Sequence, residues 1–160
     1  MKVALLGAMA VAALSSTGAQ AATLSADAKA TILSAVQLAQ NDALDFGVVA
    51  SSPTAGTVIL PNGSNTRTCS AGVTCVGAAL RGQFTVSGAA NGFVVTISVP
   101  ATATLNSGTN TMSAALTQSI TGFTSTGASQ AFFVGGTLSV GANQAAGVYT
   151  GLYTVSANYQ

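Results

Sequence analysis

Few side chains in this sequence could do chemistry. Histidine and glutamate are absent, and the acidic residues are Asp27, Asp42 and Asp45. Asp42 and Asp45 are the closest pair, but residues three apart in a strand face opposite sides, so we expect them at a turn and not as an acid–base or calcium pair. No serine lies in a Gly-x-Ser-x-Gly motif or has a histidine to activate it. These residues predict a protein that is not an enzyme and has no metal or cofactor.

Residues 1–21 predict a cleaved signal peptide. Lys2 precedes an apolar run that stops at Leu14, which is shorter than the ~20 residues that span a bilayer. Ala19 and Ala21 are the small residues that signal peptidase requires, so we expect cleavage before Ala22. The alternative is an N-terminal membrane anchor or a buried helix. We therefore expect an exported protein of the periplasm, the cell surface or an extracellular filament, with no membrane span in the mature chain.

Two cysteines, Cys69 and Cys75, lie in the stretch Thr-Cys-Ser-Ala-Gly-Val-Thr-Cys. An exported chain enters an oxidising compartment, so we expect them to form a disulfide. Closing so short a loop stabilises by only ~2 kcal/mol in the chain-entropy model, and we expect it to stiffen an exposed loop or hairpin tip. A zinc site is the alternative, but two thiols without histidine fall short of four ligands.

The mature chain is electrically neutral. Removing Lys2 leaves three positive and three negative side chains, and 3 − 3 = 0. They are Lys29, Arg67, Arg81, Asp27, Asp42 and Asp45. A neutral surface has no electrostatic attraction for nucleic acid or an anionic membrane, and it favours contact between copies.

The N-terminal stretch of the mature chain, residues 22–40, alternates between apolar and polar residues. Apolar residues occupy eight even positions between residues 22 and 38, and the alternation falters around Leu33-Ser34. These eight are Ala22, Leu24, Ala26, Ala28, Ala30, Ile32, Val36 and Leu38. Unbroken, such a strand would run ~55 Å, so either it bends near Leu33 or its first half leaves the domain and pairs elsewhere. A helix is the alternative, because Leu24, Ala28 and Ile32 are also four apart.

Residues 41–160 predict one domain of short strands separated by turns. Residues 78–87 and 93–99 alternate on either side of a Gly-rich turn and form the best candidate hairpin. Gly135-Gly136 breaks another apolar run. About nine short strands without a convincing amphipathic helix favour an all-β fold, an antiparallel immunoglobulin-like β-sandwich.

The final stretch, residues 147–160, also alternates and predicts a half-buried strand. One face carries large rings with small residues between them: Tyr149, Gly151, Tyr153, Val155, Ala157 and Tyr159. A strand in this position must pair either with its own sheet or with another copy.

Several motifs together resemble an exported bacterial family known as domain of unknown function 4402. They are Asp42-x-x-Asp45-Phe46-Gly47, Phe84-Thr-Val-Ser-Gly, Gly135-Gly136-Thr-Leu-Ser-Val-Gly and Gly147-x-Tyr-x-Gly-x-Tyr-x-Val-x-x-x-Tyr. The ending is also similar to the last strand of chaperone-usher pilins, including spore-coat-U-like subunits. That similarity implies an incomplete sandwich, whose groove is filled by the N-terminal extension of the next subunit, and a periplasmic chaperone as a further partner.

By this resemblance the two alternating stretches become a donor and an acceptor. The donor strand would be Leu24, Ala26, Ala28, Ala30 and Ile32, and the acceptor strand would be Tyr149, Gly151, Tyr153, Val155, Ala157 and Tyr159. We therefore expect a structural surface or pilus-like subunit that pairs with copies of itself or with related subunits.

Two alternatives stay open. One is a self-complete secreted sandwich that binds a small ligand or coats the surface. The other is a small outer-membrane barrel, although the chain has no tryptophan and few aromatics for interface girdles.

Overall fold

A computed structural model describes residues 20–160 of the chain. The signal peptide prediction falls on residues 1–21, so most of it, including Ala19, lies outside the described residues. The chain divides into Met1–Thr31 and a unit of Ile32–Gln160. Residues 20–160 contain no helix, and the strand ladders are antiparallel, which confirms the predicted all-β sandwich.

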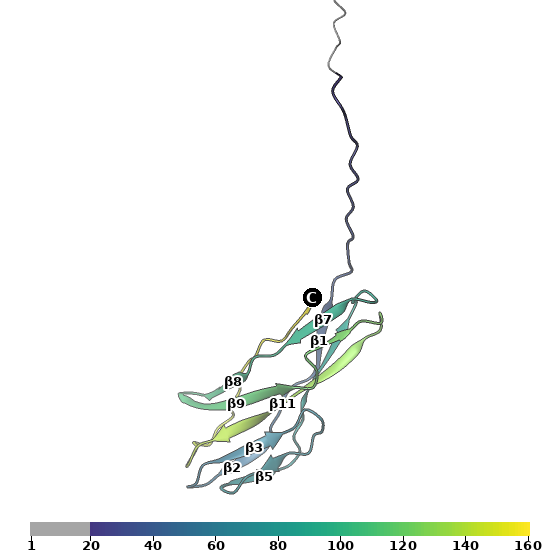
Figure 1. Cartoon of the computed structure of the whole chain (residues 1–160). Coiled ribbons are helices and arrows are strands. Elements are labelled where there is room, and N and C mark those ends of the chain that lie inside the picture. Colours follow the sequence, from purple (N-terminus) through teal and green to yellow (C-terminus); the bar gives the residue numbers. More distant parts are fainter. Residues whose placement is uncertain (1–19) are drawn as a thin grey trace, which may run out of the picture. The chain divides into compact units, whose positions relative to one another are not determined.

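Twelve strands are described in the second unit (Figure 1), more than the nine that we expected. In chain order they are β1 (Gln37–Asp42), β2 (Val48–Ser51), β3 (Gly56–Leu60), β4 (Thr68–Cys69), β5 (Val73–Val76), β6 (Gly82–Ser87), β7 (Val94–Ser98), β8 (Thr102–Ser107), β9 (Asn110–Gln118), β10 (Gly122–Thr124), β11 (Gln130–Val140) and β12 (Ser156–Tyr159). The unexpected strands are β8 and the short pair around the cysteines, β4 and β5.

β11 is the central strand of the larger sheet. It pairs with β6 over its first half and with β3 over its second half, and β9 lies along the opposite edge. The change of partner falls at Gly135, where a Cβ would clash with the Leu60 carbonyl. Our prediction that Gly135-Gly136 interrupts the strand was therefore wrong. The glycines let one long strand approach its neighbours closely.

The predicted hairpin of residues 78–87 and 93–99 was also wrong. Both stretches contain strands, β6 and β7, but β6 belongs to the larger sheet and β7 to a smaller one with β10 and β12. Gly88 and Gly92 have φ values of 73° and 82°, which suit glycine, and they turn the chain from one sheet to the other. Alternation identified the strands correctly but not their partners.

The two sheets are joined by strands that bend from one into the other. β8 and β9 form a hairpin in the larger sheet, while β7 and β10, which flank them in sequence, pair in the smaller sheet. Backbone bonds from Leu116 N to Ala101 O and from Ile97 N to Thr121 O, both 2.8 Å, lie at the bend. The result is a sandwich with a curled sheet.

The core lies between these layers. Phe132, Val134, Val58, Leu60 and Val95 are fully buried. The ring of Phe132 stacks on that of Phe84 with 5.3 Å between centroids. β6 and β7 contribute alternate residues to this core, as the period-two pattern requires.

The disulfide between Cys69 and Cys75 is confirmed. Its position is less local than we expected. Cys69 lies on β4, which pairs with β3 at the edge of the larger sheet, and Cys75 lies on β5, which pairs with β2 in a separate two-stranded sheet. The bond therefore ties the β2–β5 ribbon to the larger sheet instead of stiffening a loop tip.

The two alternating end stretches form less strand than predicted. Regular structure begins at Gln37, and residues 20–36 form neither strand nor helix. Near the other end, residues 151–155 are irregular and β12 covers only Ser156–Tyr159, with one further bridge between Thr150 and Asn106.

Candidate functional site

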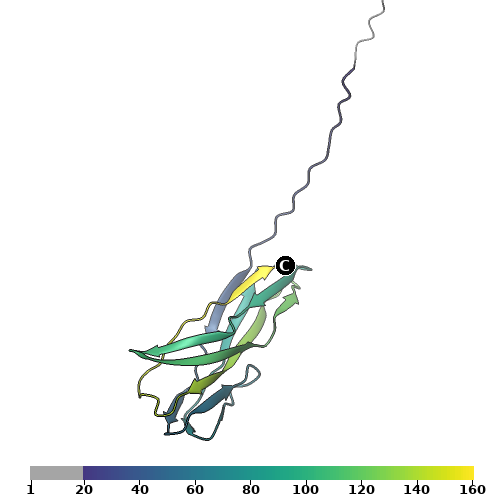
Figure 2. The ribbon, with the colours of Figure 1, turned by 60° about the vertical axis from the view of Figure 1, so that its left-hand side comes forward.

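The first and last strands of the second unit border an open seam. Among the described strands, β1 is hydrogen-bonded only to β6 and β12 only to β7. β1 and β12 lie close together and run in opposite directions (Figure 2). No ladder joins them, so each leaves a row of backbone N–H and C=O groups without a strand partner.

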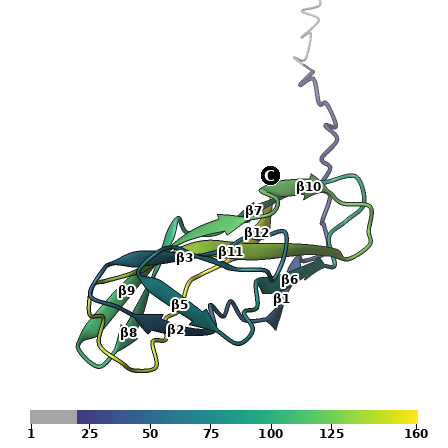
Figure 3. The ribbon, with the colours of Figure 1, turned by 90° about the horizontal axis from the view of Figure 1, so that it is seen from below.

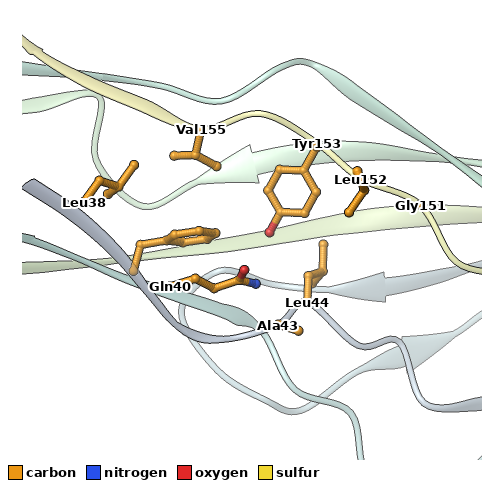
Figure 4. Close-up of a pocket in the computed structure, with 9 residues that line it drawn as sticks. Leu38, Gln40, Ala43, Leu44, Gly151, Leu152, Tyr153 and Val155 are labelled. Carbon is orange, nitrogen blue, oxygen red and sulfur yellow. The ribbon is translucent and has the colours of Figure 1, made fainter.

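An upper cavity of about 410 Å³ opens in this seam (Figure 4). One side is formed by β1 and the residues after it, and the other by the chain that leads into β12. The lining residues are Leu38, Gln40, Ala43, Leu44, Phe84, Gly151, Leu152, Tyr153 and Val155. Since Phe84 stacks on buried Phe132, the hydrophobic core itself forms part of the cavity wall.

Tyr153 directs its hydroxyl into the upper cavity (Figure 4). Its ring meets Phe84 edge-on at 6.3 Å between centroids. The hydroxyl oxygen is buried and has no hydrogen-bond partner among the described residues. Desolvation by this burial raises the pKa of Tyr153 above its ordinary value of 10.0. A buried hydroxyl without a hydrogen-bond partner costs about 1–3 kcal/mol, so a ligand or segment that bonds to the Tyr153 hydroxyl would remove this cost.

A lower cavity of about 620 Å³ continues the seam toward the other end of the unit. It lies between β2 and residues 144–149, and it shares Leu44 with the upper cavity. Its apolar wall includes Leu105, Met112, Leu138 and Val140. Figure 3 shows β2, β8 and β9 at one end of the unit and β1 and β6 at the other. The two cavities meet at Leu44, and together we call them the seam groove, which lies between residues 37–51 and residues 144–159.

Hydrogen bonds close the seam groove at both ends. At the β1 end, the Tyr159 hydroxyl donates to the Ser34 carbonyl at 2.9 Å. At the β2 end, Ser51 Oγ donates to the Gln144 carbonyl at 3.0 Å, and Asn143 N donates to the Ser52 carbonyl at 2.8 Å. Between these two closures, the backbone edges of β1 and β12 stay open.

One lip of the lower cavity is the β2–β5 ribbon, which pairs with no other described strand. The disulfide fixes β5, and Arg67 holds both the end of β5 and the residues just before β2. The Arg67 guanidinium donates to the Phe46 carbonyl and, at 2.6 Å and 3.0 Å, to the carbonyls of Val76 and Gly77. Gly47 is required here because a side chain at its φ of 72° would collide with Arg67. Covalent and polar contacts thus hold this lip where no sheet does.

The predicted donor residues make no strand in the described structure. Leu24, Ala26, Ala28, Ala30 and Ile32 are all exposed, and 93 % and 94 % of the surfaces of Leu24 and Ile32 are accessible. Two large apolar side chains thus lie outside any core.

The predicted acceptor residues are brought together along one side of the seam groove. Gly151, Tyr153 and Val155 line the upper cavity and Tyr149 the lower one. Ala157 and Tyr159 lie on β12, with Tyr159 at the closed end. The opposite side, with Leu38, Leu44 and Phe84, was not predicted. Apolar alternation marks the stretches that contain these residues. Alternation alone, however, does not distinguish a strand buried in the core from one that lines a groove.

The aspartates form no ligand cluster. Asp45 Oδ1 accepts a hydrogen bond from Gly47 N at 2.7 Å, which places it in a turn. Within residues 20–160 there is no group of three or more histidine, cysteine, aspartate or glutamate side chains that could hold a metal ion. The same part of the chain contains no helix long and apolar enough to cross a membrane.

Comparison with known proteins identifies a family. A domain of unknown function, DUF4402, matches residues 36–159, which include the strands β1–β12 and both sides of the seam groove. No curated protein and no solved structure matches the chain. Because the match covers most of the sequence, the chain belongs to the DUF4402 family.

Proposed function

We propose that the protein is a structural subunit that assembles by β-strand complementation. Residues 22–32 of one copy would fill the seam groove of the next. The observation that carries this proposal is one chain with an open groove between its first and last strands and an unpaired, alternating segment. The groove has strand edges without a partner, and the segment has an apolar face and backbone groups that could pair with them.

Backbone geometry supports strand addition. The edges of β1 and β12 present unpaired donors and acceptors to the groove, and an extended segment placed between them could bond to either. Residues 22–32 would extend for about 36 Å. The groove wall from β1 to β2 comprises the 15 residues 37–51, against the 11 residues of this segment.

Side-chain chemistry supports the same arrangement. In a strand, the even residues of the segment face one way, so Leu24, Ile32 and the alanines between them could enter the groove together. The groove offers two apolar cavities and the unpaired Tyr153 hydroxyl. The odd residues, which include Asp27 and Lys29, would face solvent. Burying a leucine or isoleucine side chain contributes about 1.5–3 kcal/mol, so two of them provide a substantial driving force.

We further propose that assembly takes place outside the cytoplasm, after removal of the signal peptide. The disulfide supports an oxidising compartment. A subunit with an open apolar groove needs protection until a partner arrives, which gives a periplasmic chaperone a role.

Deletion of residues 22–31 from the mature protein tests the proposal. The intact protein should form oligomers that are visible by size-exclusion chromatography and electron microscopy. The truncated protein should stay monomeric and bind a synthetic peptide of residues 22–35, which isothermal titration calorimetry can detect.

Two altered peptides provide matched controls. Ala28→Asp places a carboxylate on the groove-facing side and should abolish binding, whereas Ser25→Asp places the same group on the outer side and should leave binding nearly unchanged. If the intact protein is monomeric at high concentration and the truncated protein only unfolds, the subunit is self-complete. The seam groove is then better interpreted as a site for a small apolar ligand.

A further inference from the structure

Tyr159 connects the end of the last strand to the residues just before the first strand. Its hydroxyl accepts a hydrogen bond from Ala90 N at 2.7 Å and donates one to the Ser34 carbonyl at 2.9 Å. Its ring packs edge-on against Phe93 at 6.0 Å between centroids. On its other side, Ser34 Oγ donates to the Gly88 carbonyl at 2.6 Å. We call this set of contacts the Tyr159 latch.

The latch acts on the stretch that would have to bend for self-closure. To enter its own groove, the segment of residues 22–32 must reverse direction between Ile32 and Gln37, where β1 begins. Ser34 lies inside this stretch and is held by Tyr159 through its carbonyl and by Gly88 through its side chain. A reversal there would break one or both contacts. A segment that arrives from another copy has no such tether.

We propose that Tyr159 is a positioning residue that keeps the chain's own N-terminal segment out of its own groove and so favours pairing between copies. This inference rests on the proposed function. It adds a reason why residues 22–32 enter the groove of another copy and not the groove of their own chain. Short connections under strain favour exchange of a segment between copies. The Tyr159 latch constrains residues 33–36 in a comparable way without shortening the connection.

The test compares three full-length mature proteins: wild type, Tyr159→Phe and Ser119→Ala. Ser119→Ala is the control, because the Ser119 hydroxyl accepts a hydrogen bond from Phe133 N at 2.9 Å and Ser119 lines neither cavity of the seam groove. Each protein is refolded at low concentration, and native mass spectrometry measures the ratio of monomer to oligomer. Hydrogen exchange then measures amide protection of residues 24–32 within the monomer fraction.

Tyr159→Phe should raise the ratio of monomer to oligomer about fivefold for the lost bond to Ser34, and residues 24–32 should become protected in its monomers. Ser119→Ala and wild type should behave alike, with unprotected segments in their monomers. Ser34→Ala, which removes only the bond to Gly88, should shift the ratio in the same direction and provides the test if Tyr159→Phe does not fold.

The outcomes separate this inference from the proposed function. If Tyr159→Phe and Ser34→Ala assemble as wild type does, the latch proposal is wrong and strand complementation stands. If they lose assembly while their monomers stay unprotected in residues 24–32, Tyr159 only stabilises the fold, which also overturns the latch. If wild type does not assemble and the truncated protein binds no peptide, the proposed function itself fails.

Discussion

β11 and β12 both contribute to the sandwich, but they differ in how their edges are used. β11 has strand partners along both edges and its glycines allow close approach. β12 pairs along one edge only, and the chain before it borders two cavities. One side of the sandwich thus has strand partners along both edges of its central strand, while the other has strand edges without a partner. Substitutions on the two sides should therefore separate folding from assembly.

The largest effect is expected on the side of β11. Phe132→Ala removes a fully buried ring that stacks on Phe84 and should lower the free energy of unfolding by about 3–5 kcal/mol. Urea denaturation of the mature protein measures this change. A loss below about 1 kcal/mol would mean that the core is not packed around β11 as described.

Removal of the disulfide tests the link between the two sides. Cys69→Ala with Cys75→Ala should lower the free energy of unfolding by about 2 kcal/mol, because the unfolded chain gains freedom. It should also weaken binding of the peptide of residues 22–35, since the β2–β5 ribbon forms a lip of the lower cavity. Unfolding with and without reductant provides the control, because the double variant should not respond to reductant.

The open side should respond to Leu44→Ala mainly through assembly. Leu44 is half-buried and lines both cavities. Its truncation should weaken binding of the peptide about tenfold, equivalent to about 1.4 kcal/mol of lost apolar contact. Calorimetric titration of the chain lacking residues 22–31 measures the affinity. Equal losses in binding and in folding stability would contradict the distinction between the two sides.

Tyr153 gives the open side a dependence on alkaline pH. Burial raises its folded pKa above 10.0, so the unfolded state loses the proton first as pH rises. Stability from the neutral phenol is complete below the unfolded pKa and is lost as pH rises through the folded pKa. The free energy of unfolding of Tyr153→Phe should therefore fall less steeply with rising pH than that of wild type above about pH 10. Tyrosinate absorbance during titration identifies the group, and identical profiles for both proteins would refute the assignment.

The smallest effect is expected at Leu152, which is 98 % exposed at the groove rim. Leu152→Thr should change the free energy of unfolding by no more than about 0.5 kcal/mol in the monomer. A much larger loss, measured by urea denaturation below the assembly concentration, would show that the rim is covered in the monomer.

Sequence patterns predicted the strand class, the disulfide and the alternation of the last segment, because these depend on neighbouring residues. The same patterns did not predict correctly which strands pair with one another. β6 and β7 alternate well and are joined by a short Gly-rich turn, yet they lie in different sheets. β8 was missed because its alternation rests on Ala103 and Leu105 among threonines, a weak apolar signal.

The seam groove was only half predictable for the same reason. The side with Tyr149, Tyr153 and Val155 carries a recognisable motif. The opposite side is formed by Leu38 on β1, Phe84 on β6 and Leu44 in the loop after β1. Only the three-dimensional arrangement brings these three residues together. The Tyr159 contact with Ser34 spans nearly the whole unit in sequence and left no local signal.

The β1–β6 ladder has a mechanical consequence. A pull on Ser34 along the axis of β1 would first strain the bonds to Tyr159 and Gly88 and would then reach the five residue pairs between β1 and β6. Inter-strand hydrogen bonds lie across the strand axis, so this pull would shear all of them together instead of opening them one after another. If copies assemble through this segment as proposed, the whole ladder would therefore resist tension at once.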